Sequence, residues 1–195
     1  MTPKQTDRIQ KKIAKIKRAL AADKRLWDGY DDSRGLRYLS PALYLKLKDY
    51  KGAMRYFNWF QKNFSDDSGY PSFLLEWTIT LFKNCKLKEA EKKALETFFS
   101  NTYLIDKFLG KELLDLNISE HSNWENSGHA DNLVYKHSDS ELQDFTAWLS
   151  DFVISQKFHQ YANEFIEIER RLKTEPVGST RSQLVSRRYS LLVHY

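Results

Sequence analysis

The chain has 195 residues, of which 41% are apolar and 14% aromatic, so it can bury a sizeable core as one domain. Seven glycines and four prolines leave little material for a turn-rich β fold, and the single cysteine, Cys85, excludes a disulfide framework or a multi-cysteine zinc site within the chain. The net charge of +5 combines +7 in residues 1–25, −5 in residues 26–175 and +3 in the last twenty residues, so basic ends flank an acidic body.

Residues 1–25 are predicted to form a basic amphipathic helix that caps the fold. Thr2 followed by Pro3 is typical of a helix start, and four apolar residues then recur at helical spacing. These are Ile9, Ile13, Ile16 and Leu20. Charges throughout this segment leave no apolar region typical of a secretory signal, and no apolar run in the chain approaches the roughly 18 residues of a transmembrane helix. We therefore expect a cytoplasmic protein without a membrane span.

Residues 26–118 are predicted to form helices separated by short breaks. The stretch WDGYDDSRG ends the first helix, and Ser40 followed by Pro41 indicates the start of the next one. The cluster DDSGYP marks a turn before a further helix that begins near Pro71. Two more helical patterns follow, in KLKEAEKKALETFF and in YLIDKFLGKELLDL.

The last third of the chain is predicted to contain a loop, a helical pair and a tail. Residues 119–138 are polar and lack a clear period, which favours a long loop. Ser138 with Glu141 has the signature of a capping box, and apolar residues then follow a helical period through residues 139–173. Residues 174–195 are predicted to form a basic tail.

Two segments of the chain align with each other at an offset of 37 residues. They are KDYKGAMRYF at 48–57 and CKLKEAEKKA at 85–94. The alignment matches Tyr50 with Leu87, Lys51 with Lys88 and Ala53 with Ala90. This pattern resembles the tetratricopeptide family, whose unit is about 34 residues of paired helices with a large residue and an alanine at these positions. The three additional residues fit the insertion DSGY before Pro71.

The resemblance implies an all-α fold of antiparallel helical hairpins stacked as a superhelix. It covers about residues 34–107, and it departs from the family at Pro41, which stands at a glycine position. A third copy at 140–173 is degenerate, because Tyr161 stands where an alanine is expected. Because roughly three or more repeats are needed for stability, we expect the N-terminal helix and the helices after residue 138 to cap the stack.

The stretch DYKGAMRYFNWFQKNF, residues 49–64, holds six aromatic residues. Their helical spacing favours core packing between helices. A base-stacking platform is the alternative, but no lysine or arginine lies between Tyr56 and Phe60 to support it. We therefore interpret these aromatic residues as scaffold.

The resemblance places a binding groove along the first helix of each hairpin. The matching positions are Tyr38, Ala42, Leu45, Lys46, Leu75, Ile79, Phe82 and Lys83. The Lys, Arg and Asn pattern of carboxylate-clamp members is absent, which leaves an apolar groove with Lys46 and Lys83 at one end. Such a groove suits a partner helix, or a terminal helix of the chain itself. We predict a non-enzymatic adaptor that binds an unidentified protein or peptide partner in this groove.

A nucleic-acid-associated protein is the alternative prediction. The basic N-terminal helix offers Lys11, Lys12, Lys15 and Arg18 for contact with a phosphate backbone. A membrane surface is disfavoured, because no aromatic residue precedes Trp27 in this helix. A simple amphipathic helix, packed on the repeats with its lysines in solvent, explains the same pattern.

The sequence predicts neither an active site nor a metal or cofactor site. His121, His129 and His137 lie in the polar loop at intervals of eight, whereas zinc ligands usually include a short-spaced pair, so we interpret them as solvated. Cys85 has no histidine nearby in sequence, and the chain contains no glycine-rich phosphate loop.

Overall fold

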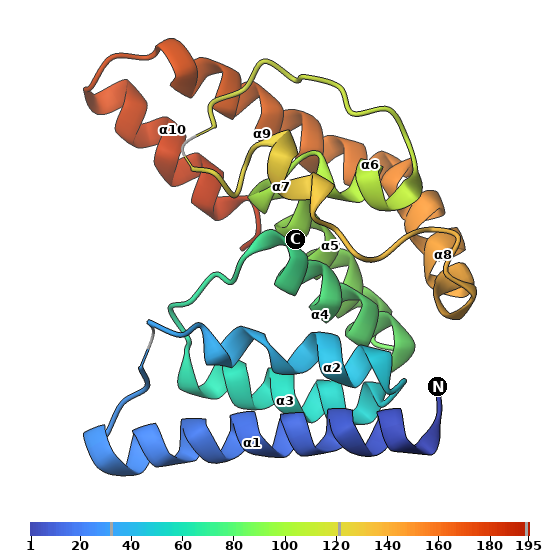
Figure 1. Cartoon of the computed structure of the whole chain (residues 1–195). Helices are drawn as coiled ribbons and strands as arrows, with labels where there is room; N and C mark the ends of the chain where they lie inside the picture. Colours follow the sequence, from blue (N-terminus) through green and yellow to red (C-terminus); the bar gives the residue numbers. More distant parts are fainter. Residues whose placement is uncertain (32, 121, 194) are drawn as a thin grey trace.

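The computed structural model describes residues 1–31, 33–120, 122–193 and 195. Within these ranges all regular secondary structure is helical, with ten α-helices, two short 3-10 helices (η1 and η2) and no strand (Figure 1). The all-α prediction is therefore confirmed, and none of the described helices is long and apolar enough to cross a membrane. The helices are α1 (Pro3–Trp27), η1 (Leu36–Tyr38), α2 (Ser40–Lys46), α3 (Tyr50–Asn63), α4 (Pro71–Lys83), α5 (Leu87–Ser100), α6 (Leu104–Leu109), α7 (Ser127–Asp131), η2 (Ser140–Leu142), α8 (Gln143–Val153), α9 (Gln156–Thr174) and α10 (Ser179–Ser190).

Helix α1 begins and ends at clear local signals. Thr2 and Gln5 form a reciprocal capping box, in which each side chain accepts the backbone N–H of the other residue. The helix ends where Asp28 adopts a left-handed conformation with φ of 49°. Three residues of its apolar stripe, Ile13, Ile16 and Leu20, are buried, and Ile9 is partly buried. The helix lies along α2 and α3 (Figure 1), and its basic residues are exposed.

The 37-residue repeat is reproduced in the backbone of two turns. Lys48, between α2 and α3, and Cys85, between α4 and α5, are both left-handed, with φ of 55° and 58°. In each turn the next residue donates its backbone N–H, at 3.0 Å, to the carbonyl five positions earlier, namely Asp49 to Tyr44 and Lys86 to Leu81. Both turns therefore use the same helix C-terminal motif, and the aligned alanines Ala53 and Ala90 are fully buried beyond them.

Two hydrophobic clusters make up the interior, and α4 lies between them. Ten of the thirteen residues of α4 are buried, so both sides of the helix are covered. Phe73 and Trp77 belong to the first cluster, with residues of α1, α2 and α3. Leu75 and Ile79 belong to the second cluster, with residues of α5, α6, α8, α9 and α10. We call these two halves the N-terminal lobe and the C-terminal lobe (Figure 1).

The helix predicted over 103–116 is shorter in the structure. α6 ends at Leu109, because Gly110 adopts φ of 71° and its backbone passes close to the ring of His137. Beyond it, Leu113 and Leu116 pack against the C-terminal lobe without forming a helix. Their spacing predicted a helix, but these leucines are partly buried in an irregular segment instead.

Three further boundaries differ from the sequence prediction. The capping box at Ser138 does not start a helix, since α8 begins at Gln143 after a 3-10 turn and lacks a side-chain cap. The 119–138 loop contains the short helix α7, capped by the side chain of Asn126. The segment 174–195 contains α10, which packs on α9 and buries Leu184.

Candidate functional site

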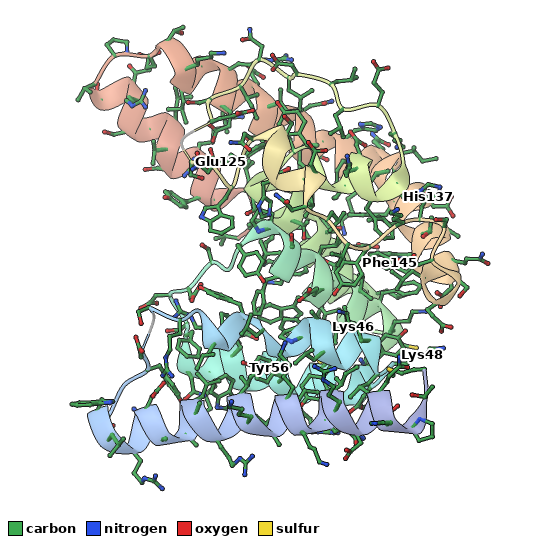
Figure 2. All side chains as sticks on the ribbon, in the orientation of Figure 1. Lys46, Lys48, Tyr56, Glu125, His137 and Phe145 are labelled. Atoms are coloured by element: carbon green, nitrogen blue, oxygen red, sulfur yellow. The ribbon has the colours of Figure 1, made fainter. Side chains whose placement is uncertain are left out.

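Helix α8 packs against the end of α4 that carries the predicted groove residues Phe82 and Lys83. Leu75 and Ile79 are 1% and 0% exposed, and both belong to the core of the C-terminal lobe. The ring of Phe82 lies 5.5 Å from that of Phe145, which Figure 2 labels on α8. Lys83 Nζ lies 2.5 Å from Asp144 Oδ1 at the start of α8. A segment of the same chain therefore occupies this end of α4.

The remaining predicted groove residues do not lie together on one open surface. Leu45 is 9% exposed and joins the same core, and Ala42 is half-buried. Lys46 is exposed, and its charge acts on the buried carboxyl of Glu76. Tyr38 lies at a different place, since its hydroxyl donates to Asp67 Oδ2 at 2.6 Å.

A cleft of about 610 Å³ opens between the two lobes, and we call it the aromatic cleft. Its walls come from the N-terminal end of α4, the C-terminal end of α5, residues 122–125, α9 and α10. Glu125, labelled in Figure 2, marks its position near α10. Six large aromatic side chains line it: Tyr38, Tyr70, Phe99, Trp124, Phe165 and Tyr189.

Two stacked ring pairs are among the side chains that line the aromatic cleft. The rings of Tyr70 and Trp124 are 5.6 Å apart with planes at 25°, and those of Phe99 and Phe165 are 4.4 Å apart with planes at 11°. Trp124 nevertheless keeps 53% of its surface exposed, and Tyr189 keeps 67%. Such large exposed aromatic residues, gathered in one concave place, are typical of interaction sites.

Three of the four charged residues that line the aromatic cleft, Asp67, Glu96 and Arg188, form ion pairs. Arg188 Nη1 lies 3.0 Å from Glu169 Oε1, and Arg37 Nε lies 2.7 Å from Asp67 Oδ2. Burial opposes the ionisation of Asp67, but hydrogen bonds from Tyr38, from a backbone N–H and from Arg37 outweigh it and lower the pKa of this carboxyl. The cleft therefore offers apolar contact more than free charge.

The basic residues predicted for the alternative function all lie on the exposed side of α1. Lys11 pairs with Asp7 at 2.8 Å, one turn earlier on the same helix. Lys12, Lys15 and Arg18 form no ion pair with the acidic residues that the structure describes. Their side chains are thus available to an external anion.

The histidines of the 119–138 loop do not form a common site. His129 approaches Ser72 Oγ at 3.3 Å and packs against the ring of Trp124, and burial lowers the pKa of its imidazole. His137 lies against Gly110, and His121 falls outside the described residues. Within the described ranges, no three histidine, cysteine or acidic side chains are grouped closely enough to hold a metal ion.

Apart from Tyr38, which belongs to the predicted groove, the sequence prediction missed the aromatic residues of the aromatic cleft. Trp124 is a single tryptophan in a polar loop, and Tyr189 lies in the segment predicted to be a tail. The only local signal was the presence of a large aromatic residue where the surrounding sequence forms no apolar pattern. No family model, curated protein or solved structure matches the chain.

Proposed function

We propose that the protein is a non-enzymatic adaptor that binds a segment of a partner protein in the aromatic cleft. The observation that carries this proposal is the exposure of Trp124 and Tyr189 in a concave site where Asp67, Glu96 and Arg188 each form an ion pair. Tryptophan and tyrosine are enriched among the residues that dominate binding energy at protein interfaces, because they bury large apolar areas at low entropic cost.

The size and lining of the aromatic cleft favour a short peptide segment as the occupant. Its volume of about 610 Å³ exceeds that of one side chain, so several consecutive residues can enter. Tyr70, Phe99 and Phe165 pack in or against the hydrophobic clusters, so three of the four stacked rings are already positioned before binding. A segment with one aromatic or aliphatic anchor and neutral neighbours fits this lining best.

Selection from a random peptide library tests the proposal. Wild type should enrich sequences with a large apolar residue, and Trp124→Ala/Tyr189→Ala should weaken their binding by about 2 kcal/mol or more, roughly thirtyfold in Kd. Trp27→Ala is the matched control, because Trp27 is 77% exposed at the end of α1 and does not line the cleft. Failure to enrich any peptide, or equal binding to the double variant, would contradict the proposal.

Binding of a nucleic-acid backbone is the second candidate, and the docking of α1 supports it. The apolar stripe of α1 is buried, while Lys12, Lys15 and Arg18 face solvent without ion pairs among the described residues. Binding to a nonspecific duplex should weaken steeply as salt rises. Reversing these three charges should reduce the magnitude of the logarithmic salt slope by about 2.7, since each phosphate contact contributes roughly 0.9. An absence of binding at low salt would exclude this candidate.

A further inference from the structure

A second cleft, separate from the aromatic cleft, lies between α1 and α3. Its volume is about 640 Å³, and we call it the basic cleft. One wall is the second half of α1, the other is the middle of α3, and Asp28 and Tyr30 lie at its end. Four basic residues, one acidic residue and three aromatic rings take part in its lining. The ten lining residues are Lys17, Leu20, Ala21, Lys24, Arg25, Asp28, Tyr30, Arg55, Tyr56 and Trp59.

The positive charge of the basic cleft is only partly compensated. Lys24 Nζ lies 3.0 Å from Asp28 Oδ1, so the single acid of the lining is already paired. Arg25 from α1 and Arg55 from α3 are exposed and form no ion pair with the described acidic residues. Two guanidinium groups on opposite walls suit a phosphate group, whose oxygens accept paired hydrogen bonds from arginine.

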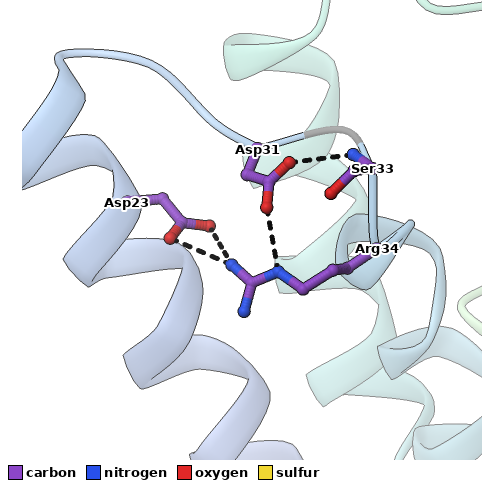
Figure 3. Close-up of polar contacts among 4 residues, drawn as sticks. All are labelled: Asp23, Asp31, Ser33 and Arg34. Atoms are coloured by element: carbon purple, nitrogen blue, oxygen red, sulfur yellow. Dashed lines mark hydrogen bonds and ion pairs between the residues drawn. The ribbon is translucent and has the colours of Figure 1, made fainter.

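Neighbouring acidic residues do not compensate this charge, because a third arginine holds them. Arg34 Nη2 lies 3.1 Å from both carboxylate oxygens of Asp23, and Arg34 Nε lies 3.0 Å from Asp31 Oδ2 (Figure 3). Hydrogen bonds from Ser33 are the main cause that lowers the pKa of Asp31. These contacts tie Arg34 to α1 and to Asp31, which is close in sequence to Asp28 and Tyr30 of the cleft lining.

The aromatic side of the basic cleft is rigidly held. The hydroxyl of Tyr56 donates to the carbonyl of Arg37 at 2.8 Å, and that of Tyr30 donates to Asn63 Oδ1 at 3.0 Å. The ring of Trp59 lies 5.2 Å from that of Tyr56 and 5.7 Å from that of Tyr30, with planes at 44° and 88°. Neither pair is a parallel stack, and Trp59 is only half-buried, so a flat ligand ring can pack against it.

We infer that the basic cleft binds a phosphorylated aromatic group, with the phosphate between Arg25 and Arg55 and the ring against Trp59. A nucleotide supplies this chemistry, either free or within a single strand. A cationic ligand is disfavoured by the surplus of positive charge, and a purely apolar ligand would leave both guanidinium groups without an anion. This site uses different residues from the outward lysines of α1 and does not depend on the peptide proposal.

Calorimetric titration of the full chain with three probes tests the inference. The probes are AMP, a twelve-residue oligothymidylate and inorganic phosphate. We expect AMP, the oligonucleotide or both to bind more tightly than phosphate, and Arg25→Gln/Arg55→Gln to weaken that binding by about tenfold or more. Trp59→Leu should weaken binding of the aromatic probes and leave phosphate binding unchanged, with circular dichroism verifying its fold. Binding of AMP identifies a free nucleotide as a sufficient ligand, whereas binding of the oligonucleotide alone assigns the site to single strands.

A charge-matched control separates this site from the rest of α1. Lys4→Gln/Arg8→Gln removes two positive charges from the exposed surface of α1 outside the basic cleft, and it should change AMP or oligonucleotide binding by less than about twofold at physiological salt. Equal weakening by both double variants would overturn the inference, because it would show nonspecific attraction. Binding of phosphate as tightly as AMP and the oligonucleotide, or no binding of either aromatic probe, would overturn it as well.

Discussion

Replacing Glu76 with glutamine should stabilise the protein at neutral pH. Glu76 lies in the middle of α4 and is only 5% exposed. The hydroxyl of Tyr135 donates to its Oε1 at 2.8 Å, while its Oε2 has no hydrogen-bond partner among the described residues. Burial is the largest effect and raises the pKa of Glu76 to about 8, against the opposing effects of Tyr135, of the charge of Lys46 and of the backbone N–H of Ala42.

The direction of the pH dependence follows from this raised pKa. In the unfolded chain the carboxyl has its ordinary pKa near 4.5, so it binds a proton more weakly there than in the folded state. The contribution of Glu76 to the free energy of unfolding is therefore fully present below pH 4.5 and is lost as the pH rises toward 8. At about 1.36 kcal/mol for each unit between 4.5 and 7, Glu76 reduces the free energy of unfolding by about 3 kcal/mol at pH 7.

Glutamine has nearly the shape of the protonated acid and cannot ionise. Glu76→Gln keeps an acceptor for Tyr135, so it should match wild type at pH 4.5 and exceed it by up to about 3 kcal/mol at pH 7. Urea unfolding curves at pH 4.5, 6, 7 and 8 measure the difference. The matched control is Glu167→Gln, on the exposed side of α9, which should change stability by less than about 0.5 kcal/mol. A difference between Glu76→Gln and wild type that does not change with pH would refute the reasoning.

Three further substitutions test the packing. Gly110→Ala should lower the free energy of unfolding by about 1–3 kcal/mol, since its φ is 71° and an added Cβ would lie 2.5 Å from the ring of His137. Guanidinium unfolding measures this loss, and an unchanged free energy of unfolding would contradict the prediction. Ile79→Ala should cost about 2–5 kcal/mol in the same assay by leaving a cavity between α4 and the C-terminal lobe, and a cost below 1 kcal/mol would argue against that packing. Arg188→Ala should lower the free energy of unfolding by about 3 kcal/mol, because it removes an ion-pair partner of Glu169, which is 2% exposed. An unchanged melting temperature at pH 7 would contradict this prediction.

The sequence predicted best those features that depend on neighbouring residues. The helix starts at Ser40 and Pro71 were visible because proline at a first helical turn is a local signal. The 37-residue repeat was visible because the positions that follow its two turns carry matching residues, including the buried alanines Ala53 and Ala90. The end of α6 was missed for two reasons. Gly110 ends a helix only when it adopts the left-handed conformation, and Leu113 and Leu116 continue the helical spacing beyond it.

The candidate sites were less predictable because they depend on contacts between distant segments. The predicted groove was derived from Tyr38, α2 and α4, and no local pattern shows that Phe145 of α8 packs on Phe82. The aromatic cleft combines residues as far apart as Tyr38 and Leu192, so no single segment of the sequence indicates it. Tyr56 is buried, as its interpretation as scaffold predicted, but the sequence did not indicate that it also lines the basic cleft.

The position of α4 between the two hydrophobic clusters has a consequence for cooperativity. A chain with two separate cores would be expected to melt in two steps, and either half could be expressed alone. Here the C-terminal lobe cannot unfold without uncovering Leu75 and Ile79, and the N-terminal lobe cannot unfold without uncovering Phe73 and Trp77. Each half thus contributes to the folding equilibrium of the other, and we expect one transition for the whole chain and no stable half-molecule.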